Sequence, residues 1–508
     1  MNRSITGIII VAFGFILVAC SSPGEGVEGQ DQNPTSSEVA GSNDPALTPG
    51  GDEEEINPAI SVSTPAADSP YVVNNVWGLQ LHKVPTDKQL QLLGDAQAGW
   101  MRDVFFEWDK IQPSRTDTPE YHWETVDEEM IAHVTASGSK PLPILLYSPP
   151  WAQKYPGYAC GPISEEALSN FGKFVGEMVN RYSTSPYEVK YYEFGNEPDI
   201  SRIHVGGSSF FGCWGEDEDD SYYGGKYYAE MLKAVYPEMK RQNPEAMLVI
   251  GGLLMDCDPI NPPENPPDSG SLKDCTPSRF LEGILEAGGG DYFDAVSFHA
   301  YDYYIGEYGK YANGNWHSQW DTTGPVLSQK VNYLDSLLHA YGYSDKELLN
   351  TEVALICGRD GKESICLADE FQTTKAYYLV RAYAQAIDKK ITANIWYSDK
   401  GWRGTNIIDA NNEPLPAYDA FAFSQKMLSG SDYLGKIGGL PSLEGYKFND
   451  QTRDIWLLWS KNIDGDNIQL PESPDAIYDV FGDQLPLPGA ELTYTIDIAP
   501  IYIVWDNE

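Results

Sequence analysis

The chain has 508 residues, of which 42% are hydrophobic and 12% are aromatic, so it is long enough for one large domain with a sizeable core and a second, smaller domain. Its formal net charge of −41 makes nucleic acid and anionic membrane surfaces poor partners, because like charges repel. We expect a solvated acidic surface and a monomer.

The N-terminal segment has the pattern of an export signal. Arg3 supplies a positive charge, and the apolar run 5–18 that follows is shorter than the ~20 residues that a membrane-spanning helix needs. The tetrad Leu-Val-Ala-Cys that ends at Cys20 resembles the bacterial lipobox, in which the cysteine is acylated and becomes the mature N-terminus. We therefore predict a lipoprotein signal over 1–20, with lipidation of Cys20. The protein would then be exported and anchored to a membrane, at the bacterial cell surface or in the periplasm. An ordinary signal peptide with a chance cysteine is the alternative.

Residues 21–70 are rich in Gly, Ser, Pro, Asp and Glu and contain no aromatic residue. A segment of this composition cannot bury enough apolar surface to offset the entropy that it loses on ordering. We predict a disordered acidic linker that connects the lipid anchor to the folded part of the chain.

Between residues 71 and 428, short apolar runs alternate with longer segments of helical periodicity. In 164–182 apolar residues recur every three or four positions, as on one face of a helix, and 325–341 and 369–388 are similar. This alternation predicts an α/β fold in which parallel strands close into a (β/α)8 TIM barrel. An open, doubly wound sheet is the competing fold, but no Gly-rich phosphate loop follows the first apolar run. The expected barrel strands are 76–81, 100–105, 141–146, 190–194, 247–251, 295–299, 347–350 and 392–397.

After the barrel, the pattern changes to short, often alternating runs that are separated by Gly, Pro and Asn-Asp turns. This pattern predicts a small all-β domain, similar to a β-sandwich, over 429–508. Its expected strands are 446–448, 454–460, 477–480, 492–496 and 502–505.

Two glutamates stand at the carboxyl ends of expected barrel strands, which is where the function of a parallel barrel lies. Glu197 follows the fourth strand in the run Asn196-Glu197-Pro198, and Glu352 follows the seventh strand after Thr351. Hydrolysis of a glycosidic bond needs two carboxyl groups that flank the bond. We therefore take these two glutamates as the candidate catalytic pair.

With these motifs, the sequence resembles the clan of retaining (β/α)8 glycoside hydrolases that includes the family five cellulases and mannanases and the family thirty-nine β-xylosidases. The resemblance extends from residue 76 to about residue 402. Segment 146–151 lacks the His that family five members often carry after the third strand, so the family within the clan stays open. The other matching motifs are Arg102 at the end of the second strand, 106–113 after it, the pair His299 and Tyr301 at the end of the sixth strand, and Trp396 in the eighth strand.

The resemblance implies a glycoside hydrolase that cleaves β-linked oligo- or polysaccharides by double displacement and uses neither a cofactor nor a metal ion. Glu197 would be the acid/base, with its pKa raised by nearby negative charge, and Glu352 would be the nucleophile. The other implied roles are a bond from Asn196 to the sugar 2-hydroxyl, a bond from Tyr301 to the nucleophile, support of the acid/base by His299, ionisation of Glu352 beside Arg102, and a sugar platform at Trp396.

Four more side chains lie near expected strand ends or in rim loops, where sugar binding and structural packing are equally open. They are His82, Trp77, Trp151 and Trp402, of which we keep His82 and Trp151 as candidates for substrate binding.

Two other functions are weighed against the hydrolase. A metal-dependent barrel hydrolase needs clustered ligands such as His-x-His, but no two of the seven histidines are close in sequence. A non-catalytic, glycan-binding lipoprotein would usually lack one of the two carboxylates, and both are present. The hydrolase is the better reading of the motifs.

Seven cysteines are present, and lipidation of Cys20 leaves an even six. Disulfides persist in the oxidising compartments that an export signal implies, and six cysteines allow fifteen pairings. All six follow expected barrel strands, and therefore belong to loops on the catalytic face. We predict bonds within loops or between adjacent loops, namely Cys160–Cys213, Cys257–Cys275 and Cys357–Cys366, with unpaired thiols or a metal site as the alternatives.

Overall fold

The structure is a computed structural model that describes residues 70–81, 85–215, 222–263, 275–318, 325–439 and 441–507. These residues belong to one compact unit, Ser61–Glu508. Among them, no helix is both long enough and apolar enough to cross a membrane. The expected export signal, the acidic linker up to residue 69, the lipidation site Cys20 and the rim residue His82 lie outside the described residues.

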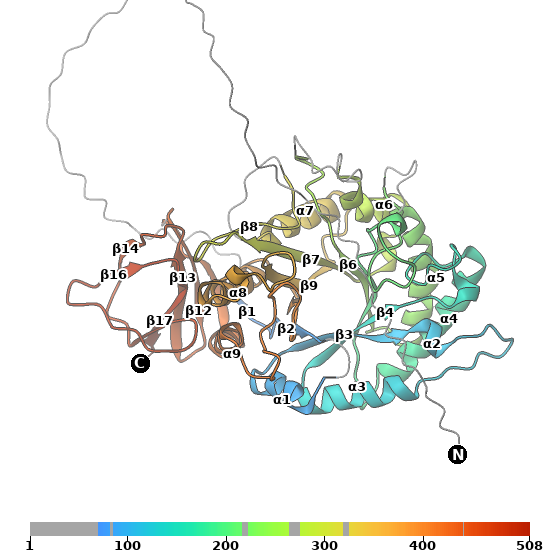
Figure 1. The fold of residues 1–508 in the computed structure, drawn as a ribbon, viewed down its shortest axis with the longest axis horizontal. Coiled ribbons are helices and arrows are strands. Elements are labelled where there is room, and N and C mark those ends of the chain that lie inside the picture. Colours follow the sequence, from blue (N-terminus) through green and yellow to red (C-terminus); the bar gives the residue numbers. More distant parts are fainter. Residues whose placement is uncertain are drawn as a thin grey trace, which may run out of the picture. The chain divides into compact units, whose positions relative to one another are not determined.

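The main body is a closed parallel barrel (Figure 1), which confirms the predicted (β/α)8 fold. Neighbouring strands run in the order β6-β5-β4-β3-β2-β10-β9-β7, and pairing of β6 with β7 closes the ring. A short strand, β8 (Tyr311–Asn313), continues from β7 as an antiparallel partner. The barrel strands are β2 (Trp77–Gln80), β3 (Trp100–Glu107), β4 (Lys140–Leu146), β5 (Tyr191–Asn196), β6 (Met247–Leu253), β7 (Ala295–Tyr304), β9 (Glu347–Ile356) and β10 (Ala393–Trp396).

Helices follow most of these strands and surround the barrel in Figure 1. Local sequence explains where some of them begin: at α1, Thr86 and Gln89 form a reciprocal capping box that satisfies the first free backbone N–H groups. The helices are α1 (Asp87–Asp95), α2 (Trp108–Ile111), α3 (Glu124–Ser137), α4 (Glu165–Tyr182), α5 (Gly225–Gln242), α6 (Phe280–Glu286), α7 (Leu327–Ala340), α8 (Asp369–Asp388) and α9 (Pro416–Leu428).

The inside of the barrel has an apolar layer below a polar one. Side chains from seven of the eight strands form the apolar cluster, and Gly78 of β2 has no room for a side chain because Ile395 fills the space. Two residues further along five of the strands, the inward positions become polar, at Gln80, Arg102, Glu193, Ser297 and Thr351. The apolar layer consists of Trp100, Leu142, Tyr191, Val249, Ala295, Leu349, Ala393 and Ile395. The polar layer therefore faces the carboxyl end of the barrel, where sites form.

The C-terminal part of the chain forms a six-stranded antiparallel sheet in the order β1-β11-β12-β13-β17-β15, together with a two-stranded ribbon of β14 and β16. The prediction of an all-β domain is therefore confirmed, but the sheet also takes in β1, which we had expected to belong to the barrel segment 71–428. Strand β1 joins the C-terminal sheet because it pairs with β11, with Tyr71 opposite Tyr433. The strands are β1 (Tyr71–Val72), β11 (Asp432–Lys436), β12 (Leu443–Asn449), β13 (Arg453–Ser460), β14 (Asp466–Gln469), β15 (Ala476–Tyr478), β16 (Thr493–Ile496) and β17 (Ile501–Asp506).

Three disulfides join the loops at the carboxyl end of the barrel, in the pairing that the sequence predicted. The Cα atoms of the paired cysteines lie 5.4 to 5.6 Å apart, well inside the range that a disulfide spans. The bonds are Cys160–Cys213 between the loops after β4 and β5, Cys257–Cys275 within the loop after β6, and Cys357–Cys366 within the loop after β9.

Candidate active site

Glu352 lies within β9, where the barrel interior becomes polar. Parallel pairing with β7 places it opposite His299. The residue is 6% exposed, and its carboxylate accepts hydrogen bonds from Arg102 Nη1 at 2.7 Å and from the Tyr301 hydroxyl. The pKa of Glu352 is raised overall, because burial outweighs the Arg102 charge and the Tyr301 hydrogen bond, which both lower it. These two donors favour the ionised form, which is the form that can act as a nucleophile.

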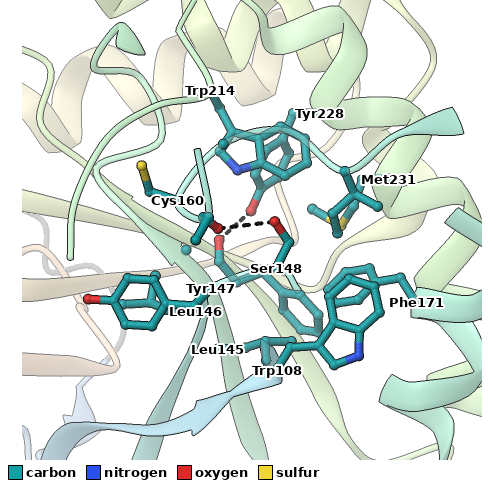
Figure 2. Close-up of a pocket in the computed structure, with 15 residues that line it drawn as sticks. Trp108, Leu145, Leu146, Tyr147, Ser148, Cys160, Phe171, Trp214, Tyr228 and Met231 are labelled. Carbon is teal, nitrogen blue, oxygen red and sulfur yellow. Dashed lines mark hydrogen bonds between the residues drawn. The ribbon is translucent and has the colours of Figure 1, made fainter. Parts of the chain in front are cut away.

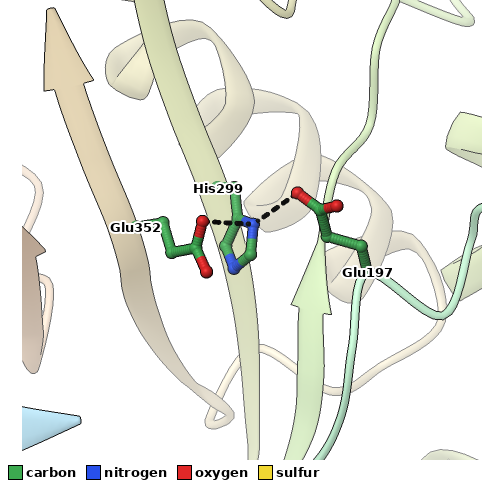
Figure 3. A group of neighbouring side chains, drawn as sticks. All are labelled: Glu197, His299 and Glu352. Atoms are coloured by element: carbon green, nitrogen blue, oxygen red, sulfur yellow. Dashed lines mark hydrogen bonds and ion pairs between the residues drawn. The ribbon is translucent and has the colours of Figure 1, made fainter. Parts of the chain in front are cut away.

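Glu197 follows β5 directly and has an unusual backbone conformation. Its φ of 50° lies in the left-handed region, which residues other than glycine rarely occupy, and its N–H donates to the Gly252 carbonyl at 2.9 Å. Figure 3 shows that its side chain points toward His299 and Glu352. His299 Nδ1 lies 2.9 Å from Glu197 Oε1 and 3.4 Å from Glu352 Oε2.

The two carboxyl groups are close together but lie in different surroundings. One oxygen of Glu197, one oxygen of Glu352 and a ring nitrogen of His299 all lie within 4.8 Å of one another. Burial, and then the charge of Glu352, raise the pKa of Glu197 well above its usual range. One carboxyl group is therefore held toward its anion by two donors, while its neighbour is pushed toward its protonated form.

Arg102 is the central cation of the site. It is fully buried on β3, and its Nε and Nη2 bond Glu193 at 2.6 and 3.2 Å. Its Nη1 bonds Glu352 and also Gln80 Oε1 at 2.8 Å, and its Nη2 bonds Asn196 Oδ1 at 2.8 Å. All five N–H groups of the guanidinium are thus used inside the barrel.

Glu193 is a residue of the candidate site that the sequence reasoning missed. It lies on β5, has no exposed surface, and also accepts hydrogen bonds from Ser297 Oγ at 2.7 Å and Thr351 Oγ1 at 2.9 Å. A buried ion pair requires this kind of complete hydrogen bonding. The signal in the sequence was a lone charge inside an otherwise apolar strand run.

His299 and Lys330 form a second buried layer behind the carboxylates. Burial, and then the charges of Arg102 and Lys330, hold the pKa of His299 well below its usual range, so the imidazole is neutral. Lys330 of α7 is fully buried, and its Nζ donates to the carbonyl oxygens of His299 and Leu254 at 2.6 Å each. The amine therefore fixes the backbone of β7 at His299, whose ring bonds Glu197.

An open cleft of about 650 Å³ adjoins Glu352. Its described lining residues come mainly from β3, α3 and the loops after β3, β4, β5 and β10. They are Gln80, Arg102, Asp103, Val104, Glu107, Lys110, Glu129, His133, Ile144, Tyr147, Asn196, Phe210, Glu352 and Tyr397. A volume of this size lies in the range of small-molecule binding sites.

The expectation that Trp396 forms a sugar platform is wrong. Trp396 is fully buried, its ring contacts Tyr378 of α8 edge-on, and its Nε1 donates to the Thr405 carbonyl at 2.8 Å. Successive residues of a strand point to opposite faces, so Tyr397, not Trp396, turns toward the cleft. Beyond it, Trp402 is 47% exposed, and its ring centroid lies 6.2 Å from that of Tyr301.

The other candidate tryptophans have packing roles. Trp77 is fully buried and stacks on Tyr383 of α8. Trp151 contacts Trp108 edge-on at 5.2 Å and is not among the described residues that line the cleft. The structure therefore brings Glu197, Glu352, Arg102, Asn196, His299 and Tyr301 together but leaves out Trp77, Trp151 and Trp396.

A small cavity of about 40 Å³ lies between β4, β5, α4 and α5 (Figure 2). Its walls are mostly apolar and include Trp108, Phe171, Trp214 and Met231. Its polar groups are satisfied internally, since the Tyr228 hydroxyl donates to the Phe194 carbonyl at 2.6 Å. A cavity of this size holds about one water molecule, so it does not compete with the cleft as a substrate site.

Within the described residues, Glu197, His299 and Glu352 are the group whose ligand atoms are close enough to share a metal ion. Their surroundings do not favour one. Arg102 already compensates the charge of Glu352 at 2.7 Å and would repel a cation at the same oxygens. The donor set suits one protonated and one ionised carboxyl group better than it suits a metal ion.

No protein-family model matches the chain, and no curated protein matches it. Among solved structures, it is similar to a family 39 glycoside hydrolase from the gut symbiont Bacteroides cellulosilyticus, with a TM-score of 0.60 and 17% identity over 85% of this chain and 81% of that chain. It is also similar to the catalytic domain of GH30 xylanase C from Talaromyces cellulolyticus, with a TM-score of 0.57 and 10% identity over 87% and 99% of the two chains. A glucosidase from Croceicoccus marinus gives a TM-score of 0.54 and 13% identity over 88% and 98%. At these identities the likeness establishes a shared fold.

Proposed function

We propose that this protein is a retaining glycoside hydrolase that cleaves β-linked oligo- or polysaccharides by double displacement. The observation that carries the proposal is the pair Glu197 and Glu352, whose nearest oxygens lie within 4.8 Å at the carboxyl end of the barrel. Carboxyl groups about 5–5.5 Å apart are typical of retaining enzymes, because a wider gap is needed to admit the water of an inverting reaction.

In the first step, a Glu352 oxygen forms a bond to the anomeric carbon as the bond from that carbon to the leaving oxygen breaks. Glu197, which is protonated because its pKa is raised, gives its proton to the departing oxygen. The donors Arg102 and Tyr301 hold Glu352 in place for attack.

In the second step, Glu197 is a carboxylate and acts as the base. It takes a proton from a water molecule, whose oxygen attacks the anomeric carbon while the bond to Glu352 breaks. The product leaves with Glu197 protonated and Glu352 ionised, as at the start. Two successive inversions give net retention.

Three side chains are placed to bind the sugar. Asn196 lines the cleft with its Oδ1 bonded to Arg102, which orients the amide for the 2-hydroxyl. Tyr397 lines the cleft beside Glu352, and the half-exposed Trp402 offers an apolar face on which a sugar ring can stack.

We also propose that the protein is exported and lipid-anchored through Cys20. Three disulfides on the catalytic face support an oxidising location. Replacement of Cys20 by Ser should move the protein out of the membrane fraction with its specific activity unchanged. A variant that stays in the membrane fraction would rule out this anchor.

The experiment that tests the enzyme is an assay of the wild type and Glu352→Gln on aryl β-glycosides and on β-glucan, mannan and xylan. The proposal predicts turnover by the wild type alone. Binding of a glycan without turnover by either protein would instead make this a glycan-binding protein on a barrel scaffold.

A further inference from the structure

Resting on the proposed function, we infer that the cleft beside Glu352 accepts an uncharged sugar as glycone and rejects a sugar that carries a carboxylate or a sulfate. The residues that set this preference are Asp103 and Glu129, two acidic side chains of the cleft wall, and His133, a buried histidine of the same wall.

The cleft lies on the glycone side of the bond to be cleaved. Glu352 and Asn196 both line it, whereas Glu197 is not among its described lining residues. In the proposed reaction, the nucleophile attacks the glycone, and the acid/base stands beside the leaving group. The sugar that becomes bonded to Glu352 therefore extends into this cleft.

Asp103 is a buried acid in the cleft wall that forms no ion pair among the described residues, and the charge of Arg102 only partly offsets the causes that raise its pKa. It is 9% exposed, and its Oδ1 accepts a hydrogen bond from the Val104 N–H at 2.8 Å. Burial, together with the charges of Asp399 and Glu129, raises the pKa of Asp103 to about 8. The cleft wall therefore disfavours ionisation of its own Asp103 carboxyl group. Burial of a substrate carboxylate in the same place is disfavoured for the same physical reasons.

The rest of the wall adds no net positive charge. Lys110 is paired with Glu107 at 2.5 Å, and the pKa of Glu129 is raised by burial and by Glu107. Arg102 has all five N–H groups bonded to protein acceptors, so none remains to receive a carboxylate of the substrate. An acidic sugar therefore finds no cation to bind in the described part of the cleft.

His133 is an uncharged side chain of the cleft wall. It is 2% exposed, its ring packs edge-on against Phe105, and neither ring nitrogen has a hydrogen-bond partner among the described residues. Burial lowers the pKa of His133, so the ring is neutral and offers one donor and one acceptor. His133 therefore adds no positive charge to the wall that could bind an acidic sugar.

The test compares matched neutral and acidic substrates. Hydrolysis and equilibrium binding are measured for 4-nitrophenyl β-D-glucoside against the β-D-glucuronide, and for the β-D-galactoside against the β-D-galacturonide. For each pair of which one member binds or is hydrolysed, we expect kcat/KM and affinity to be at least about tenfold higher for the neutral member. A ratio of this size corresponds to one unfavourable charge pair near a protein surface.

Charge-reversal variants locate the effect. Glu129→Lys should narrow the neutral-to-acidic ratio by roughly tenfold, and Asp103→Asn should narrow it less. Glu177→Lys makes the same change in net charge on the exposed face of α4 and should leave the ratio unchanged. An equal effect of Glu129→Lys and Glu177→Lys would overturn the assignment to this cleft.

The outcomes separate the inference from the proposed function. Equal or better use of the acidic members overturns the inference and leaves the hydrolase intact. If no substrate is hydrolysed, the proposed function fails, and the binding ratios still decide the inference. Absence of binding by every neutral member would overturn it.

Discussion

At the scale of single residues, Glu197 and Glu352 share one barrel opening yet have different partners. Glu352 has Arg102 and Tyr301 as donors, whereas Glu197 has the neutral ring of His299. Replacement of Glu352 by Ala should lower kcat by roughly a thousandfold or more, because no other group can form the covalent bond. Azide, which attacks from the side of the missing carboxylate, should restore part of the activity and yield the inverted α-glycosyl azide.

The matched variant Glu197→Ala should respond to the leaving group. General acid catalysis contributes about 10²–10⁴-fold, but an activated aryl leaving group needs little protonation. We therefore expect a large loss of kcat/KM on unactivated oligosaccharides and a loss of less than about tenfold on dinitrophenyl glycosides. Equal losses on the two kinds of substrate would contradict the assignment of Glu197 as the acid.

The same residue sets the pH dependence. Because the pKa of Glu197 is raised, its proton is present at low pH and is lost as the pH rises through that pKa. The value of kcat/KM on unactivated substrates should therefore fall on the alkaline side. In Glu197→Gln, which has no proton to lose, this alkaline limb should disappear from the profile. A limb of unchanged position in that variant would assign it to another group.

At the scale of single elements, the loop 402–406 after β10 is bonded to buried side chains on one side and exposes Trp402 on the other. Trp396 bonds the Thr405 carbonyl, and the buried Nζ of Lys375 donates to the carbonyl oxygens of Gly404 and Asn406 at 2.9 and 2.5 Å. Trp402 projects from this supported loop with almost half of its surface free.

Variants of the two tryptophans should separate these roles. Trp402→Ala should raise KM roughly fivefold, the equivalent of the ~1 kcal/mol of an aromatic contact, with little change in Tm. Trp396→Phe should lower stability by about 1–3 kcal/mol, because it leaves the Thr405 carbonyl without a donor. A drop in Tm for Trp402→Ala would contradict its assignment as an exposed sugar-binding residue. An unchanged Tm for Trp396→Phe would contradict its assignment as a structural residue.

Strand alternation explains why the sequence misled us at Trp396. The motif pointed to the aromatic residues at the end of the eighth strand, but it did not decide which one faces inward. Ala393 and Ile395 belong to the apolar layer inside the barrel, so Tyr397 faces inward as well and Trp396 faces the helices. The same alternation along β5 shows that Glu193, two residues after the inward-facing Tyr191, also faces the barrel interior, and would have identified it as a residue of the candidate site.

Each disulfide stabilises the fold by an amount that rises with the logarithm of the length of chain that it encloses. Cys160–Cys213 spans 53 residues and Cys357–Cys366 spans 9, which corresponds to about 4 and about 2.5 kcal/mol in the chain-entropy treatment. Replacement of both cysteines of a pair by Ser should lower the free energy of unfolding more for the first pair than for the second, as measured by chemical denaturation. The reverse order would mean that strain or residual structure dominates.

At the scale of the whole molecule, the sequence predicted those features that a local pattern encodes. Each barrel strand is a compact apolar run, and the longest helices are clearly periodic, so their places were foreseen. The pairing of β1 with β11 was not, because it joins segments about 360 residues apart and both are short. Strand β11 has only two apolar residues among its five, so its run gave no strand signal.

The catalytic pair was predictable because parallel topology brings all strand ends to one rim. Glu197 and Glu352 are far apart in sequence, yet Glu197 directly follows β5, Glu352 lies within β9, and the two parallel strands run toward the same rim. The cleft could not be predicted in the same way. Its acidic wall combines Asp103 of β3 with Glu129 of α3, and only the packing of that helix against the barrel brings them to one cavity.

The central claim is that Glu197 and Glu352 act by double displacement. The most direct test is to follow hydrolysis of a β-linked substrate by proton NMR and to read the anomeric signal of the first product before mutarotation. The account predicts that the β-anomer appears first and the α-anomer grows in later. Initial appearance of the α-anomer would show a single displacement and would contradict the assignment of Glu352 as a nucleophile.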